Sequence, residues 1–265
     1  MGSARRISVV TPLFPYSRQS KLSQRRRLLK SHANEPTEEI EGLKTGYKSW
    51  AATSGTLIAS LIQESGADHL IVMDLHEPQY QGFFTIPVDS VYAEPVIINY
   101  IKTSIPNWRS AVVVSPTAGG AKRATSISNK LHLQFALVHN AGDRYQQESE
   151  AVGLVGDVTD RVTIMIDDMI DTASTMLNAS KMLKAHGAKE IHVIVIHGIF
   201  SSDSIDKINK SSIDTIACTN SVPQDDFRSL CPKLQTIDVS TILGETIRRS
   251  FNGESVTKLY EYDEY

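Results

Sequence analysis

Short β-branched runs alternate along this chain with longer segments whose apolar residues recur at helical spacing. The strand candidates are short, mostly apolar runs at residues 7–12, 69–73, 111–115, 135–139, 163–166, 191–197, 215–219 and 234–238. Such alternation of strands and helices is typical of parallel α/β architecture. We therefore predict an α/β fold built on parallel sheets.

Two of the helical segments end in the same way. Residues 54–65 and 174–186 each carry apolar side chains on one face, and each is followed by a glycine, Gly66 or Gly187. Glycine suits the left-handed position just past a helix end. In both places an alanine and a new strand follow, which indicates two related halves.

Residues 20–45 break this rhythm because they are polar and have little apolar patterning. Three arginines, Arg25 to Arg27, precede a series of glutamates. A phosphate patch and a localisation signal remain alternatives for the basic triplet, but a solvated charge run is the favoured interpretation. We predict a surface insertion, assign it no chemistry and leave its role open.

Composition excludes several classes of protein. Of the 265 residues, 41% are hydrophobic and 22% are charged, as in ordinary soluble domains. The net charge of -3 gives no global attraction to nucleic acid or anionic lipid, so we expect neither as a partner. With only Cys218 and Cys231, no signal-like start and no apolar run of membrane-spanning length, we expect a cytoplasmic protein with free thiols.

The most informative motif is residues 163–175, where a buried-type strand leads to Asp167 and Asp168 and then to a turn of small residues. Ligands of open α/β sheets sit beyond the carboxyl ends of strands, and the helix start that follows attracts anions. The hydroxyls of Thr172, Ser174 and Thr175 add donors, while the carboxylates suit sugar hydroxyls or Mg²⁺. The motif predicts a sugar-phosphate site, unless the carboxylates merely end the strand and the hydroxyls merely cap the helix.

A second strand-to-helix turn contains Gly119 and Gly120. Paired glycines allow backbone N–H groups to approach a diphosphate. Any tight turn can require glycine, however, and Lys122 and Arg123 are more often solvated helix charges than ligand contacts. This motif is weaker evidence for a phosphate site.

Two single residues follow earlier strands. His76 ends the sequence Met73-Asp-Leu-His, and a neutral imidazole there either forms a structural hydrogen bond or binds a metal. Arg18 follows the first strand and has the shape to clamp a phosphate, although alone it is a surface arginine. Spacing does not decide either case.

Taken in order, these stretches resemble the ribose-phosphate diphosphokinases, also called phosphoribosyl pyrophosphate synthetases. The resemblance covers nearly the whole chain outside residues 20–45, and that insertion is similar to those of long-insert fungal paralogues. The matching stretches begin at Ser3-Ala-Arg-Arg-Ile, Phe14-Pro-Tyr-Ser-Arg-Gln, Gly66-Ala-Asp-His, Met73-Asp-Leu-His, Gln81-Gly-Phe-Phe, Gly119-Gly-Ala-Lys-Arg, Leu154-Val-Gly-Asp-Val, Asp167-Asp-Met, His197-Gly-Ile-Phe and Ile247-Arg-Arg.

The resemblance implies two domains of type I phosphoribosyltransferase fold, residues 1–92 and 93–265, with the last residues packing back on the first domain. It also implies homo- or hetero-oligomeric assembly and Mg²⁺-dependent transfer of diphosphate from ATP to ribose 5-phosphate, for nucleotide biosynthesis. The family's amino-terminal strand and helix units have no counterpart here, so we expect the first domain to be incomplete.

The resemblance also assigns roles to individual residues. The residues implied to bind ribose 5-phosphate are the acidic pair and the turn after it: Asp167, Asp168, Asp171, Thr172, Ala173, Ser174 and Thr175. Those implied to bind ATP and diphosphate are Arg18, Gln19, Gly119 and Gly120. The residue implied to bind Mg²⁺ is His76.

Four positions depart from the family pattern. Thr117 replaces an Asp that binds Mg²⁺, and a neutral oxygen binds Mg²⁺ far less well. Asn140 and Gly142 replace a Lys and an Arg that neutralise the transferring group, and Ser174 replaces a Gly in the phosphate turn. These losses predict weak or no activity for the chain alone, with its catalytic residues unknown.

Three functions therefore remain open at this point. The chain is an enzyme subunit that makes phosphoribosyl pyrophosphate, or a non-catalytic structural or regulatory subunit of a hetero-oligomer. A nucleobase phosphoribosyltransferase shares the acidic turn but leaves Arg18, Gln19 and the second domain unexplained.

Overall fold

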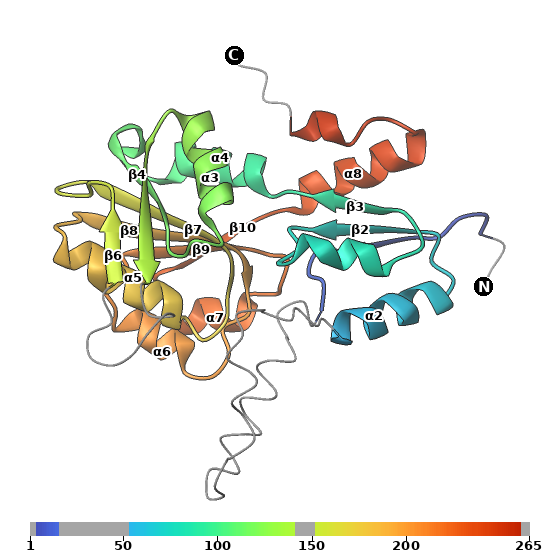
Figure 1. Ribbon diagram of the computed structural model, residues 1–265, viewed down its shortest axis with the longest axis horizontal. Helices are drawn as coiled ribbons and strands as arrows, with labels where there is room; N and C mark the ends of the chain where they lie inside the picture. Colours follow the sequence, from blue (N-terminus) through green and yellow to red (C-terminus); the bar gives the residue numbers. More distant parts are fainter. Residues whose placement is uncertain (1–3, 16–52, 141–151, 261–265) are drawn as a thin grey trace, which may run out of the picture. The chain divides into compact units, whose positions relative to one another are not determined.

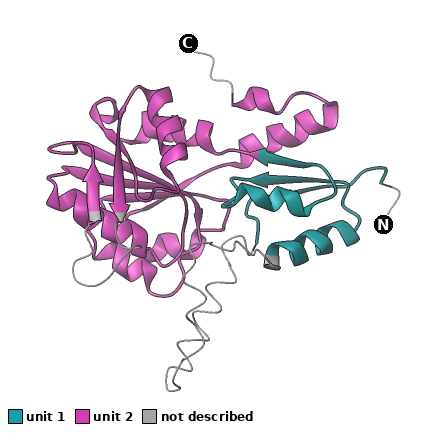
Figure 2. Ribbon diagram, in the orientation of Figure 1, with its two compact units in different colours: residues 1–90 teal, residues 91–265 magenta. Residues whose placement is uncertain are grey.

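The computed structural model describes residues 4–15, 53–140 and 152–260. The chain divides into two compact units, residues 1–90 and 91–265 (Figure 2). One sheet has three strands and the other has seven, and the elements alternate as α/β. The predicted α/β fold with parallel sheets is confirmed.

The smaller unit is built on a sheet with the strand order β1-β2-β3. Strand β1 covers Ser8–Thr11, β2 covers His69–Met73 and β3 covers Val88–Val91. Strands β1 and β2 are parallel, with Val9 opposite Leu70. The 3₁₀ helix η2 (Pro78–Phe83) follows β2, and the core of this unit joins Phe14, Leu70, Val72, Leu75 and Tyr80.

Helix α2 (Thr53–Glu64) packs against this core along one face. Ile58 and Ile62, which lie one turn apart, contact the core, whereas Leu57 and Leu61 are mainly exposed. Gly66 follows with φ +91°, the left-handed conformation predicted for the residue past this helix. The predicted helix and its end are confirmed.

The larger unit has a seven-stranded sheet in the order β10-β9-β8-β7-β4-β5-β6. All neighbouring strands are parallel except β5 and β6, which are antiparallel. The strands are β4 (Val112–Ser115), β5 (Gln134–Asn140), β6 (Val152–Val155), β7 (Val162–Ile170), β8 (Glu190–Gly198), β9 (Thr215–Thr219) and β10 (Leu234–Ile237).

Helices cover both faces of this sheet, with α3 and α4 on one side and α5 and α6 on the other (Figure 1). Met176 of α5 and Ile208 of α6 pack in one core with Val114 and Val193 of the sheet. In the described ranges no helix is long and apolar enough to span a membrane. The helices are α3 (Glu94–Ser104), η3 (Trp108–Ser110), α4 (Ala121–Leu131), α5 (Ser174–Ala185), α6 (Ser204–Asn209), α7 (Asp225–Leu230), α8 (Ser240–Asn252) and η4 (Thr257–Leu259).

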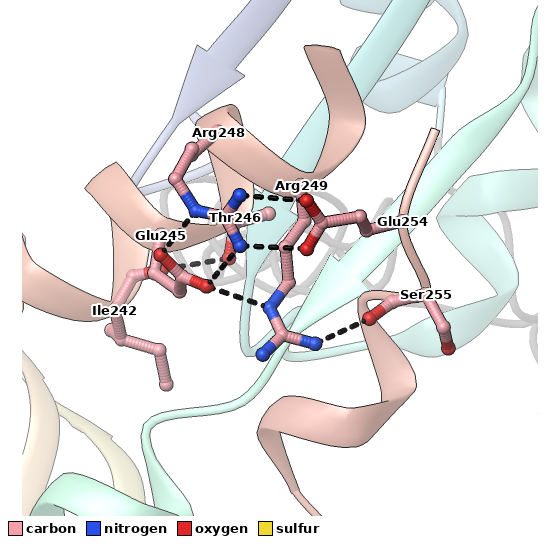
Figure 3. A network of polar contacts seen from close by, with 7 residues as sticks. All are labelled: Ile242, Glu245, Thr246, Arg248, Arg249, Glu254 and Ser255. Atoms are coloured by element: carbon pink, nitrogen blue, oxygen red, sulfur yellow. Dashed lines mark hydrogen bonds and ion pairs between the residues drawn. The ribbon is translucent and has the colours of Figure 1, made fainter. Parts of the chain in front are cut away.

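The end of α8 carries a network of ion pairs (Figure 3). Arg248 donates from Nε to Glu245 Oε2 at 2.9 Å and from Nη2 to Glu254 Oε2 at 2.7 Å. Arg249 donates from Nε to Glu245 Oε1 at 2.8 Å and from Nη1 to the Ser255 carbonyl at 2.9 Å. Hydrogen bonds from the two guanidiniums lower the pKa of Glu245 to about 2.

The structure corrects the predicted strand at residues 163–166. Strand β7 continues to Ile170, so Asp167 and Asp168 lie inside the strand rather than after its end. The cause is that Met169 and Ile170 are buried and pair with His197 and Gly198 of β8. The apolar pattern predicted the end of the strand just before Asp167, because that residue is charged. It also did not predict β3 and β6, which are four residues long.

Candidate functional site

Strands β4 and β7 are neighbours, but the chain leaves them in opposite directions. After β4 the chain passes through α4 to β5 on one side, and after β7 it passes through α5 to β8 on the other. In open α/β sheets, ligands bind outside the carboxyl ends of strands at such a switch point. Because Val114 pairs with Met165, β4 ends beside Ile166, and the turn at residues 116–120 starts next to Asp167. Strand β7 continues to Ile170 before the turn at residues 171–173.

The acidic pair lies in β7 beside this switch point. Asp168 is only 6% exposed, and its backbone N–H donates to Asp167 Oδ1 at 3.0 Å. Burial, and then the charge of Asp168, raise the pKa of Asp167 to about 7, while Arg123 acts in the opposite direction. Near neutral pH the pair therefore exchanges a proton that ordinary carboxylates have already lost, and in its protonated form it can both accept and donate hydrogen bonds.

The glycine turn after β4 approaches the acidic pair closely. A Cβ at Gly120 would lie 3.2 Å from Asp167 Oδ1 and 3.1 Å from Ser115 Oγ. The turn is closed by Thr117, whose carbonyl accepts from Ser115 Oγ at 2.7 Å and whose Oγ1 accepts from the Gly120 N–H at 3.2 Å. The structure thus brings Gly120 and Asp167 together, and the Thr117 hydroxyl stabilises the turn.

The turn between β7 and α5 ends at Ala173, which is buried and has φ +62°. Helix α5 begins at Ser174 with no side-chain cap and with no acidic residue in its first turn. The Thr172 and Ser174 hydroxyls lie 3.2 Å apart. The first N–H groups of a helix have no intrahelical acceptor, so this start suits an anion such as phosphate.

One residue of this region was not found from the sequence. The Ser201 hydroxyl, in the loop after β8, donates to Asp171 Oδ1. Because β8 pairs directly with β7, the residues after both strands meet at the same edge of the sheet. In the sequence, Ser201 directly follows the His197-Gly-Ile-Phe stretch that resembles the family. The contact between Ser201 and Asp171 could not be predicted from this, because it depends on β7 and β8 being neighbours in the sheet.

The remaining predicted residues belong to other parts of the chain. His76 is exposed and lies in the smaller unit, just after β2. Asn140 is the last residue of β5. Arg18, Gln19 and Gly142 lie outside the described residues.

The predicted Mg²⁺ site was tested against the donor groups present. In the part of the chain that the structure describes, no three His, Cys, Asp or Glu side chains form a group that could hold a metal ion. Thr117 offers only a neutral hydroxyl, which already accepts from Gly120. The Mg²⁺-binding role of His76 therefore stays a prediction, because Mg²⁺ is usually held by one or two protein carboxylates together with substrate phosphates and water.

Comparison with known proteins supports the resemblance. The family model described as phosphoribosyl synthetase-associated domain matches residues 143–261. Ribose-phosphate pyrophosphokinase 5 of Schizosaccharomyces pombe is 45% identical over 269 residues, covering 99% of this chain and 76% of that protein.

A solved structure agrees with the sequence comparison. The phosphoribosylpyrophosphate synthetase of Mycobacterium smegmatis superposes with a TM-score of 0.73 at 30% identity, over 95% of this chain and 74% of that one. The similarity thus extends across nearly the whole chain in both sequence and structure. We conclude that the chain belongs to the ribose-phosphate pyrophosphokinase, or phosphoribosyl pyrophosphate synthetase, family.

Proposed function

We propose that this chain binds ribose 5-phosphate at the turn between β7 and α5 and serves as a subunit of a ribose-phosphate diphosphokinase. The observation that carries the proposal is the acidic pair of β7 next to an acid-free helix start, at the switch point of the sheet. Asp167 and Asp168 accept hydrogen bonds from the ribose hydroxyls. The 5-phosphate accepts from the first N–H groups of α5 and from the Thr172 and Ser174 hydroxyls.

In the family reaction, the 1-hydroxyl oxygen of ribose 5-phosphate forms a bond to the β-phosphorus of ATP and loses its proton to the solvent. The bond from that phosphorus to the AMP oxygen breaks, and AMP leaves. The role we give to this chain is positioning. The acidic pair fixes the ring and the α5 turn fixes its phosphate, so that the 1-hydroxyl is held in one orientation. The glycine turn at Gly119 and Gly120 is the proposed diphosphate contact.

We further propose that the chain turns over slowly or not at all alone. Thr117, Asn140 and Gly142 stand where the family has one carboxylate and two cations. Losing a positioned charge from a developing transition state costs about 3 kcal/mol, or roughly a hundredfold in rate. The use of the Thr117 hydroxyl in its own turn favours a second candidate, a non-catalytic subunit that supports active partners in a hetero-oligomer.

Cysteine chemistry is consistent with the cytoplasmic location included in this proposal. Cys218 and Cys231 are both buried free thiols. Burial raises the pKa of Cys218 to about 12, so its thiol stays protonated and unreactive at neutral pH. Thiols of this kind persist in a reducing compartment.

Isothermal titration with ribose 5-phosphate tests the binding site. We expect Asp168→Asn to weaken binding at least a hundredfold, because a buried carboxylate that accepts ribose hydroxyls is replaced by an amide. Asp206→Asn, an exposed carboxylate on α6, is the matched control and should bind like the original chain. Equal affinity of the Asp168 variant and the control would contradict the placement of the sugar.

An AMP-release assay with ribose 5-phosphate, ATP and Mg²⁺ tests the activity. We expect little release from the purified chain, and a gain when Thr117→Asp, Asn140→Lys and Gly142→Arg are combined. Turnover like that of an ordinary family enzyme in the unmodified chain would overturn the non-catalytic alternative. Product analysis with free nucleobases present would reveal a phosphoribosyltransferase instead.

A further inference from the structure

The loop between β8 and α6 is fastened to the β7–α5 turn at adjacent residues. The Ile199 and Phe200 N–H groups both donate to the Ile170 carbonyl, at 2.9 and 3.4 Å. Ile170 is the last residue of β7, and the next residue, Asp171, accepts from the Ser201 hydroxyl. The loop therefore holds both the backbone and the first side chain of the turn that we propose to bind phosphate.

The loop is also fixed by packing and hydrogen bonds to residues outside the β7–α5 turn. The Phe200 ring is 3% exposed and packs edge-on against Phe227, with centroids 5.5 Å apart. It also leaves no room for a side chain at Gly198, where a Cβ would lie 2.6 Å from the ring. The buried Gln224 amide donates to the Gly198 carbonyl at 2.8 Å. These contacts restrain the backbone of the loop just before Ser201.

Both neighbours of Ser201 have strained backbones. Phe200 has φ +49° and Ser202 has φ +57°, in the left-handed region that L residues other than Asn and Asp rarely adopt. Such strain persists only where the surroundings enforce it, and it concentrates at functional sites. Here the enforced conformation presents the Ser201 hydroxyl to Asp171.

Asp171 needs such a partner if a phosphate binds beside it. A carboxylate three residues before the first N–H groups of α5 repels a phosphate bound there. A hydroxyl that donates to Oδ1 stabilises that charge and fixes its direction, leaving the α5 amides to the phosphate. Loss of the hydroxyl removes a donor that favours this direction of the carboxylate, and a carboxylate that turns toward a helix start competes for its amides.

We propose that Ser201 is a positioning residue for phosphate recognition: its hydroxyl holds the Asp171 carboxylate so that the start of α5 stays open to the 5-phosphate of the sugar. This inference rests on the proposed function, because it names the residue that sets the affinity of that same turn. Ser201 acts through Asp171 and need not touch the ligand.

The test is ribose 5-phosphate binding by calorimetry to four variants of the full chain. Ser201→Ala should weaken binding tenfold to a hundredfold, the range for loss of a hydrogen bond to a charged group. Ser201→Thr keeps the hydroxyl and should bind like the original. Ser202→Ala, at the exposed neighbouring position, is the matched control and should also bind normally.

The fourth variant separates positioning from general damage to the loop. In an Asp171→Asn background, Ser201→Ala should cause no further loss, because the charge that it restrains is gone. An additional loss of the full size would overturn the proposal. If Ser201→Ala does not fold, Ser201→Cys, of nearly the same size but a weak donor, replaces it with the same expectation.

The outcomes also separate this inference from the function on which it rests. If the unmodified chain fails to bind ribose 5-phosphate, the proposed function is wrong and the role of Ser201 falls with it. If the unmodified chain binds and Ser201→Ala binds equally well, the function stands and the role of Ser201 is wrong.

Discussion

Two groups of carboxylates in the larger unit have opposite surroundings. Asp167 lies in the central strand β7 next to a second carboxylate, and its pKa is raised to about 7. Glu245 lies on the surface of α8 between two guanidiniums, and its pKa is lowered to about 2 (Figure 3). The first arrangement costs stability and the second adds to it.

This difference indicates which group has a function. A fold has no structural need for two carboxylates side by side in a buried strand, and groups with strongly perturbed pKa values concentrate at sites that bind or react. The α8 network is explained by its own ion pairs and by its contacts with Glu254 and Ser255, just after the helix. This contrast supports the proposed ligand site at β7 rather than one at α8.

The largest effect is expected for Asp167→Asn, measured as the free energy of unfolding in urea against pH. The pKa of Asp167 is raised above its unfolded value, so the stability it contributes is fully present below about pH 4 and is lost as pH rises through about 7. At about 1.4 kcal/mol per pKa unit, the loss is up to about 4 kcal/mol.

The variant lacks this titration, so its unfolding free energy relative to the original chain should rise between pH 4 and pH 8. Asp206→Asn, at an exposed carboxylate on α6, serves as the control. If the unfolding free energy of Asp167→Asn changes with pH in parallel with that of the original chain, the pKa of Asp167 is not raised by folding.

An intermediate effect is expected for Gly120→Ala. The backbone there, at φ -81° and ψ -7°, is ordinary for any residue, so only the crowding of Asp167 and Ser115 opposes a methyl group. Overpacking of this kind costs about 1 to 3 kcal/mol. Thermal unfolding should show this loss, and ribose 5-phosphate affinity should fall with it.

Gly119→Ala is the matched control for this experiment. A Cβ at Gly119 would meet only Thr117 Oγ1 within 4 Å, at 3.8 Å, which is an ordinary contact. Gly119→Ala should therefore cost clearly less stability than Gly120→Ala. Equal tolerance at both positions would mean that the approach of the glycine turn to the acidic pair is not tight.

The smallest effect is expected for Arg248→Ala in the α8 network. The pKa of Glu245 is lowered, so its stabilising contribution is present above about pH 4.5 and is lost as pH falls toward 2. The network is exposed, so salt screens it. The variant should unfold slightly earlier at pH 7 in low salt, and the difference should disappear in 1 M NaCl or at pH 2.

Ribose 5-phosphate affinity should not respond to Arg248→Ala. A loss of affinity comparable to that of Gly120→Ala would remove the distinction between a structural and a functional group of carboxylates.

The sequence predicted more of the fold than of the site geometry. Strands β2 and β9 have the predicted bounds, and α5 begins at the predicted Ser174, because apolar periodicity and turn residues are local signals. The continuation of β7 through Asp167 and Asp168 was not predictable in this way. It depends on pairing with β8, which is set by the tertiary structure.

The site shows the same limit. The residue types of the β7–α5 turn are enough to indicate a sugar phosphate, since carboxylates, hydroxyls and a helix start have local meanings. The contacts between Gly120 and Asp167 and between Ser201 and Asp171 join positions 47 and 30 residues apart in sequence. Only the strand order places them together.

The most direct test of the central claim is a crystal structure of this chain with ribose 5-phosphate. We predict the phosphate at the start of α5, within hydrogen-bonding distance of the backbone N–H groups of residues 174 and 175, with the ribose hydroxyls at Asp167 and Asp168. Density for the sugar elsewhere, with this turn closed by its own side chains, would contradict it.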